Sequence, residues 1–205
     1  VISTERFADV TKVNGYELQD ELEDNIGKYG VENCMVITRS NKRANLFNQQ
    51  IRSRVLWQED EIAAGDLLMV VKNNYTWLGQ DSKAGFIANG DIIEILKIVG
   101  YEEIYDRKFA NVICRLIDYP EEPELETKLL LDTIMVEAPN LPRKEMKAFF
   151  EAVEQDFMEF SNRKQRVKKV LESPHFNALQ VKFAYAVTCH KSQGGQWPVV
   201  FIDQG

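Results

Sequence analysis

Thr188-Cys189-His190-Lys191-Ser192-Gln193-Gly194-Gly195 is the stretch that decides the fold of this chain. It lies between two apolar runs, VKFAYAV at 181–187 and VVFI at 199–202, each short and β-prone enough to be a buried strand. In an α/β sheet, polar loops at the carboxyl ends of strands present the groups that bind ligands. The stretch therefore predicts an α/β fold with a binding site in this loop.

The side chains of this loop are of the kinds that hold oxyanions. Lys191 offers a point charge. Thr188, Ser192 and Gln193 offer neutral hydrogen-bond donors. The glycines let backbone N–H groups come close to a ligand. A polar turn that binds nothing is the other interpretation of the same composition, so the pattern predicts a phosphate site and leaves that alternative open.

The longer string YAVTCHKSQGGQWPVVFID at 185–203 resembles motif V of superfamily 1 DNA helicases, in the form found in the RecD-like (exonuclease V alpha subunit) branch. The segment CMVITRSN at 34–41 is similar to motif IV of that branch, an apolar strand followed by Thr-x-x-Asn. Gly65-Asp66, Asn73-Asn74-Tyr75 and Asn89-Gly90-Asp91 resemble the entry into an SH3-like barrel inserted in the second motor domain. The resemblance covers residues from about 34 to 203.

The fold that the resemblance implies is a partial RecA-like parallel sheet, as in a helicase second motor domain, with an inserted SH3-like antiparallel β-barrel and a long helix. The motor domain would occupy residues 1–63 and 177–205, and the barrel with its helix would occupy 64–176. The residues themselves favour the same class, because β-prone runs separated by turn residues are typical of a small barrel. These runs cover 66–75, 86–99, 109–117 and 128–136.

Helices are predicted from apolar spacing and from their end signals. We expect one helix over 15–29, closed by Gly30, and a second over 42–56 that Ser40 or Asn41 caps after a buried strand at 34–38. Apolar residues at spacings of three and four then predict a single long helix over 143–171, which Ser173-Pro174 ends.

The resemblance also implies roles for residues of the central loop. Thr188 and His190 would contact the DNA backbone, and Lys191 would serve DNA or ATP. Relatives commonly carry a glutamate at the position of Gln196, so its assignment lacks the expected charge. The candidate ATP-binding residues of the loop are Gln193, Gly194 and Gln196.

Three further residues are candidates outside that loop. Arg39 follows the strand at 34–38 and is placed to bind phosphate of ATP, the alternative being a solvated or salt-bridged surface arginine. Asn74 and Tyr75 are candidate DNA contacts, since an aromatic ring can stack on an unpaired base. Asparagine is also common in turns, so turn formation is the alternative for Asn74.

The charge of the chain restricts the kind of DNA binding. A formal charge of −7 and a pI near 5.0 argue against a free-standing basic DNA-binding domain. Bases gather at 39–54 and at 163–169, and the second group is either a solvated helix face or a DNA-backbone patch. No apolar stretch approaches the length of a membrane span, and we expect a cytoplasmic protein.

Cysteine and histidine spacing predicts no metal site. Cys34 and Cys114 are expected to be small buried hydrophobes, and alternation along the strand is expected to turn Cys189 inward. His175 has no obvious partner and is interpreted as structural.

The function that the resemblance implies is that of an ATP-dependent DNA helicase, an ATP hydrolase that uses Mg²⁺ and moves 5′ to 3′ along single-stranded DNA. It implies an exonuclease V-like repair enzyme, with nuclease subunits as further partners. The sequence holds no G-x-x-x-x-G-K-[ST] phosphate loop and no strand ending in an Asp-Glu pair.

We therefore expect the first motor domain, which would bind most of the ATP and Mg²⁺, upstream of Val1, and we expect these 205 residues alone to be inactive. The alternative is a non-enzymatic DNA- or protein-binding module with a vestigial helicase loop. A bare structural domain is disfavoured by the density of polar groups in the loop.

Overall fold

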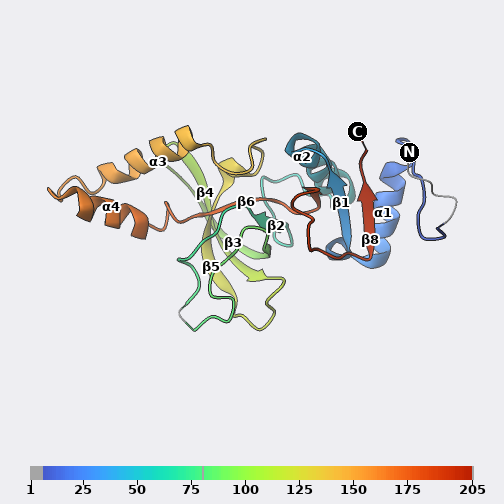
Figure 1. Ribbon diagram of the computed structural model, residues 1–205, viewed down its shortest axis with the longest axis horizontal. Helices are drawn as coiled ribbons and strands as arrows, with labels where there is room; N and C mark the ends of the chain where they lie inside the picture. The colour runs from blue at the N-terminus through green and yellow to red at the C-terminus, as the bar shows by residue number, and fades with distance from the viewer. Residues whose placement is uncertain (1–6, 80, 205) are drawn as a thin grey trace.

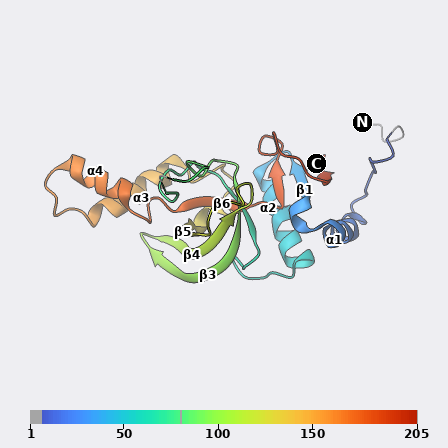
Figure 2. The same ribbon diagram turned by 90° about the horizontal axis from the view of Figure 1, so that it is seen from below.

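A computed structural model of the protein describes residues 7–79 and 81–204. The molecule is elongated, with an α/β part at one end, a barrel in the middle and a pair of helices at the other end (Figures 1 and 2). Within the described ranges, no helix has the length and apolar character needed to cross a membrane.

The α/β part is built on a parallel sheet of three strands in the order β7-β1-β8. Strand β1 spans Cys34–Thr38, as predicted, β7 spans Ala186–Thr188 and β8 spans Val199–Ile202. Both outer strands run parallel to β1, and Thr38 is paired with Thr188. The carboxyl ends of the strands therefore meet at one edge, where α/β sheets present ligand groups.

Two helices cover this sheet. Helix α1 spans Leu18–Tyr29 and ends at Gly30, whose φ of 88° is the left-handed conformation that glycine adopts without strain. A 3-10 turn over Val31–Asn33 leads into β1. The predicted helix and its closing glycine are confirmed, and α1 contacts β1 through its apolar stripe.

Helix α2 spans Asn41–Gln50 and continues as a π-helical turn over Ile51–Val55. Ser40 is extended, and its hydroxyl accepts a hydrogen bond from the Arg43 backbone N–H, so the predicted cap is confirmed for Ser40. The helix packs against β1 and β7. Its buried residues are Ala44, Asn45, Phe47 and Asn48.

Five strands form a closed barrel in the order β2-β3-β4-β5-β6. They span Leu67–Val70, Ile92–Ile104, Arg107–Leu116, Leu125–Leu130 and Leu179–Phe183. The expected antiparallel pairing holds between neighbours except β5 and β6, which are parallel. This pair is parallel because a crossover through the two helices separates it. The strand expected over 128–136 starts earlier and gives way to a 3-10 turn at Leu131–Thr133.

The helix predicted over 143–171 is two helices. Helix α3 spans Arg143–Gln155 and α4 spans Arg163–Glu172, and α4 folds back along α3 (Figure 1). The Asn162 side chain caps α4 by accepting from the Lys164 backbone N–H at 2.9 Å. The apolar spacing continues across the break, which is why the pattern predicts one helix. The predicted end at Ser173 is confirmed.

The apolar run 181–187 is also divided, so the expectation of one buried strand there is wrong. Residues up to Phe183 belong to β6 in the barrel, Ala184 and Tyr185 lie in neither strand, and β7 enters the sheet at Ala186. The residues of β6 and those of β7 are mostly buried and mostly apolar, so the amino-acid composition does not show where one strand ends and the other begins. Part of the segment 177–205, which we assigned to the motor domain, therefore pairs in the barrel.

Polar side chains hold the crossing in place, that is, the short segment in which the chain passes from β6 of the barrel to β7 of the sheet. The Arg52 guanidinium donates to both carboxylate oxygens of Asp66 at 2.9 Å, and the Tyr185 hydroxyl donates to the same carboxylate at 2.8 Å. Burial raises the pKa of the Tyr185 phenol, so its proton is retained. Asn48 accepts from the Ala186 backbone N–H at 2.7 Å and donates to the Phe183 and Ala186 carbonyls.

Candidate functional site

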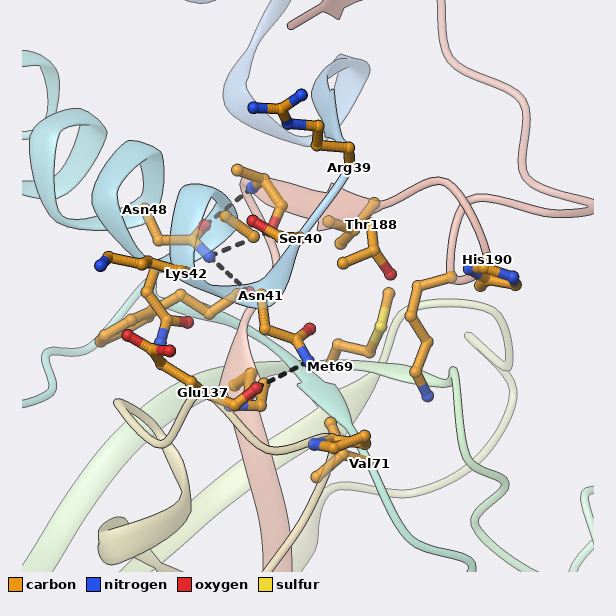
Figure 3. A pocket seen from close by; sticks show the side chains of 18 residues that line it. Arg39, Ser40, Asn41, Lys42, Asn48, Met69, Val71, Glu137, Thr188 and His190 are labelled. Carbon is orange, nitrogen blue, oxygen red and sulfur yellow. Dashed lines mark hydrogen bonds between the residues drawn. The ribbon is translucent and has the colours of Figure 1, made fainter. Parts of the chain in front are cut away.

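A cavity of about 510 Å³ lies where the carboxyl edge of the sheet meets the barrel (Figure 3). Its walls come from the start of α2, from the loop after β7 and from the barrel with the segment that follows β5. The site is therefore assembled from three separate parts of the chain, and neither the sheet nor the barrel contains it alone.

The first wall is the N-terminal end of α2. The unpaired N–H groups of a first helical turn carry partial positive charge. Thr38, fully buried, donates its hydroxyl to the Ser40 carbonyl at 3.1 Å and so fixes the turn before the helix. The Asn41 amide donates to the Glu137 carbonyl at 2.9 Å and joins this wall to the segment after the barrel (Figure 3).

The second wall is the loop after β7. The Thr188 carbonyl accepts from the backbone N–H groups of Lys191 and Ser192 at 2.8 and 3.1 Å. The Cys189 backbone N–H donates to the Thr38 carbonyl at 3.0 Å. These bonds make the loop a tight turn that is anchored to β1, and the Thr188 hydroxyl is turned toward the space beside Asn41 (Figure 3).

Four predicted site residues line this one cavity, namely Arg39, Thr188, His190 and Lys191. We predicted Arg39 for ATP, Thr188 and His190 for DNA, and Lys191 for either ligand. The structure thus brings together residues predicted for two ligands. Arg39 and His190 are exposed, and their side chains extend away from Asn41 in different directions (Figure 3). Thr188 is half-buried beside it.

The predicted ATP residues of the loop lie outside the cavity. Gln193, Gly194 and Gln196 are exposed and do not line it. The backbone conformation and the packing of the loop explain why both Gly194 and Gly195 are glycines. Gly194 has a φ of 87°, and a Cβ at Gly195 would collide with the Trp197 ring.

Asn74 and Tyr75 also lie outside the cavity, on the barrel. Asn74 is 8% exposed; its side-chain oxygen accepts from Thr76 N–H at 2.9 Å, and its amide donates to the Asn177 carbonyl at 2.8 Å. Its hydrogen-bonding groups are thus occupied by the turn and by the distant Asn177 carbonyl. The Tyr75 ring is 70% exposed and stacks on Phe86 with centroids 4.9 Å apart.

Lys191 connects the loop to this part of the barrel. Its ammonium donates to the Asn89 side chain, and the Asn89 backbone N–H donates to Asn73 at 2.8 Å. The Asn73 amide in turn donates to the Tyr75 hydroxyl at 3.1 Å. Burial lowers the pKa of Lys191. The loop and the exposed aromatic ring are therefore ends of one chain of hydrogen bonds.

Most of the charged side chains in the cavity wall are cationic. The charged or titratable residues that line it are Arg39, Lys42, Glu137, Lys182, His190 and Lys191. Sequence reasoning missed Lys182, although a single lysine within a run predicted to be buried was a signal, because lysine is almost never fully buried. Asn41 was considered as a cap and proves to be a bridge across the site.

Other predicted residues have mixed outcomes. Cys34 and Cys114 are buried as expected, whereas Cys189 is exposed. That expectation is wrong because β7 ends at Thr188, so strand alternation does not reach Cys189. His175 does have a partner, since its Nε2 lies 2.8 Å from a carboxylate oxygen of Glu102.

The described residues contain no group of three or more His, Cys, Asp or Glu side chains arranged to hold a metal ion.

Comparison with known proteins adds one finding. Residues 183–205 match the model of the UvrD-like helicase C-terminal domain. The match begins at the last residue of β6 and covers β7, the loop and β8, which is a short part of the chain. No curated protein matches the chain. The match supports a helicase-related role for the segment that contains the loop.

Proposed function

We propose that this chain is the second motor domain of a RecD-like, ATP-dependent DNA helicase, in which a RecA-like sheet carries an SH3-like barrel. In this proposal residues 1–63 and the part of 177–205 that follows β6 form the motor part, and 64–176 together with β6 form the insertion. The observation that supports it is the cavity, where the segment that resembles motif IV meets the loop that resembles motif V.

The ligand proposed for the cavity is the phosphodiester backbone of single-stranded DNA. The start of α2 offers N–H groups, and the Thr188 hydroxyl and Lys191 ammonium offer a neutral and a charged donor. Contacts of this kind position a strand without reading its bases. The exposed Tyr75 ring is proposed to stack on a base outside the cavity.

ATP is proposed to lie on the other side of the same loop. Gln193, Gly194 and Gln196 are exposed there, away from the cavity. One short loop that contacts both ligands couples them, and such coupling is reciprocal, because DNA that favours ATP binding must be favoured by ATP to the same degree. Hydrolysis is assigned to a phosphate loop that these residues do not contain.

The first test is binding of a fluorescent oligothymidylate to the 205-residue chain at low salt. We expect Thr188→Val and Lys191→Ala each to weaken binding severalfold, because each removes a phosphate donor. Lys97→Ala, on an exposed position of β3, is the matched control and should bind as the wild type does. Equal binding by all variants would remove the cavity from the DNA path.

The second test separates the helicase from a non-enzymatic DNA-binding module. In a protein that carries this chain together with a phosphate loop, we expect single-stranded DNA to tighten ATP binding and Gln193→Ala to reduce ATP turnover. A binding module predicts DNA binding with no effect on ATP. An ATP affinity that DNA leaves unchanged would therefore favour the module.

A further inference from the structure

Lys182 is a buried cation with neutral partners. It lies on β6 of the barrel and is 8% exposed. Its ammonium donates to the Thr133 carbonyl at 3.2 Å and to the Val136 carbonyl. Within the described residues it forms no ion pair, although a buried charge is normally paired.

Lys182 is one of the residues that line the cavity. An ammonium has three N–H donors, and carbonyls occupy two of them here. Glu137 on the same wall is exposed and makes no ion pair with Lys182. The other charged or titratable groups that line the cavity are Arg39, Lys42, His190 and Lys191. The charged side chains that line the cavity with Lys182 are thus mostly cationic, and an anion in the cavity would supply the missing negative charge.

We propose that Lys182 is a phosphate-binding residue contributed by the barrel, so that one phosphate group is held between the barrel and the loop of the sheet. The inference rests on the proposed function and deepens it, because it names a contact from the barrel side. Lys182 lies just before the segment that matches a helicase domain. The shared chemistry is a phosphate group, which DNA or a nucleotide can supply.

The charge on Lys182 gives this binding a pH dependence. Burial lowers the pKa of Lys182 to about 8. A bound phosphate favours the charged ammonium, so the pKa rises in the complex. Binding is then full below pH 8 and weakens above it, by about tenfold per pH unit until the pKa of the complex is reached. Burial also lowers the pKa of Lys191, so its contribution has the same direction and is measured separately with Lys191→Met.

The experiment measures affinity of the 205-residue chain for oligothymidylate, ATP without metal, and inorganic phosphate, each from pH 7 to pH 10. Lys182→Met keeps the apolar stem, and Lys97→Met is the control at an exposed lysine. We expect Lys182→Met to lose about tenfold in affinity at pH 7 for the preferred ligand. Its affinity should also fall less steeply above pH 8. The ligand that responds identifies the source of the phosphate.

A wild-type measurement keeps the inference testable if Lys182→Met does not fold. In chain labelled with ¹³C at lysine Cε, we expect one resonance to titrate near pH 8 and to move to higher pH with saturating ligand. Binding by wild type with no change in Lys182→Met or in that resonance would overturn the inference alone. Absence of binding by wild type to all three ligands would overturn the proposed function together with it.

Discussion

The barrel and the sheet differ in how they close their interiors. The barrel strands are hydrogen-bonded in a ring, and its core side chains, among them Leu68, Ile93 and Leu129, are fully buried. The sheet has two open edges, and on its outer strand β8 the side chains of Val200 and Ile202 remain exposed. Only the barrel is thus closed by its own strands, and the sheet depends on its neighbours.

The two parts share one apolar core, and a line of polar side chains adds hydrogen bonds between them. Asn41, Asn45 and Asn48 lie along one face of α2 and bond to backbone groups after β5 and at the crossing into β7. Arg52 continues that line with its bond to Asp66. We call the boundary between the sheet part and the barrel, where these hydrogen bonds lie, the seam. The comparison indicates that these few side chains fix the seam and the cavity beside it. Their removal should therefore affect the sheet more than the barrel.

The largest effect is expected from Arg52→Met. Asp66, which is 2% exposed, would lose the cation that balances its buried charge, and we expect the free energy of unfolding to fall by about 3 kcal/mol. Urea denaturation measures the change. Arg54→Met, at an exposed neighbour, should stay within about 0.5 kcal/mol of wild type. Equal stability of the two variants would show that the ion pair does not hold the seam.

Asn48→Ala should have the next largest effect. The change leaves the Ala186 N–H and two carbonyls without this partner at the buried crossing, for a cost of about 2 kcal/mol. Hydrogen exchange should report faster opening at β7 than within the barrel. The exposed Gln49→Ala is the control. Uniform acceleration across both parts would contradict the idea of a locally specified seam.

Ser40→Ala tests the helix wall of the cavity. Loss of the cap to the Arg43 N–H should cost about 1 kcal/mol in thermal or urea unfolding. Ser40→Asp, which can accept the same bond, should restore the stability, and Ser53→Ala at an exposed position should leave it unchanged. If Ser40→Asp is as unstable as Ser40→Ala, capping is not the reason.

The smallest effect concerns the barrel itself. The Lys128 ammonium, followed by Asn111 and His175, lowers the pKa of Glu102 from 4.5 to about 2. Because the folded pKa lies below the unfolded value, this contribution is present above pH 4.5 and is lost as the pH falls toward 2. Glu102 is 37% exposed, so solvent screening keeps the effect small.

Glu102→Gln should therefore lose a little stability at pH 6 and show a shallower decline between pH 4.5 and pH 2 in urea denaturation. Glu103→Gln, at the exposed neighbour, should follow the wild-type curve. If the stability of Glu102→Gln falls between pH 4.5 and pH 2 as steeply as that of wild type, the contact between Glu102 and Lys128 contributes nothing to the loss of stability in acid.

Sequence signals that act over a few residues were sufficient for several elements. The strand Cys34–Thr38, the cap at Ser40 and the end of α1 at Gly30 are where the pattern predicts them. The division of 143–171 was missed, because a helix that folds back keeps the same apolar spacing while burying it against a different neighbour.

By itself the sequence determined that a polar, glycine-containing loop follows a buried strand beside a strand, cap and helix unit, because strand propensity, capping and turn chemistry are local. Only the tertiary structure decided that β6 joins the barrel and β7 the sheet, and that Lys182 borders the cavity with Thr188. The bond that marks the crossing joins Asn48 to Ala186, residues 138 positions apart. The choice of partner at that distance depends on packing and hydrogen bonding in the folded chain, which no local pattern contains.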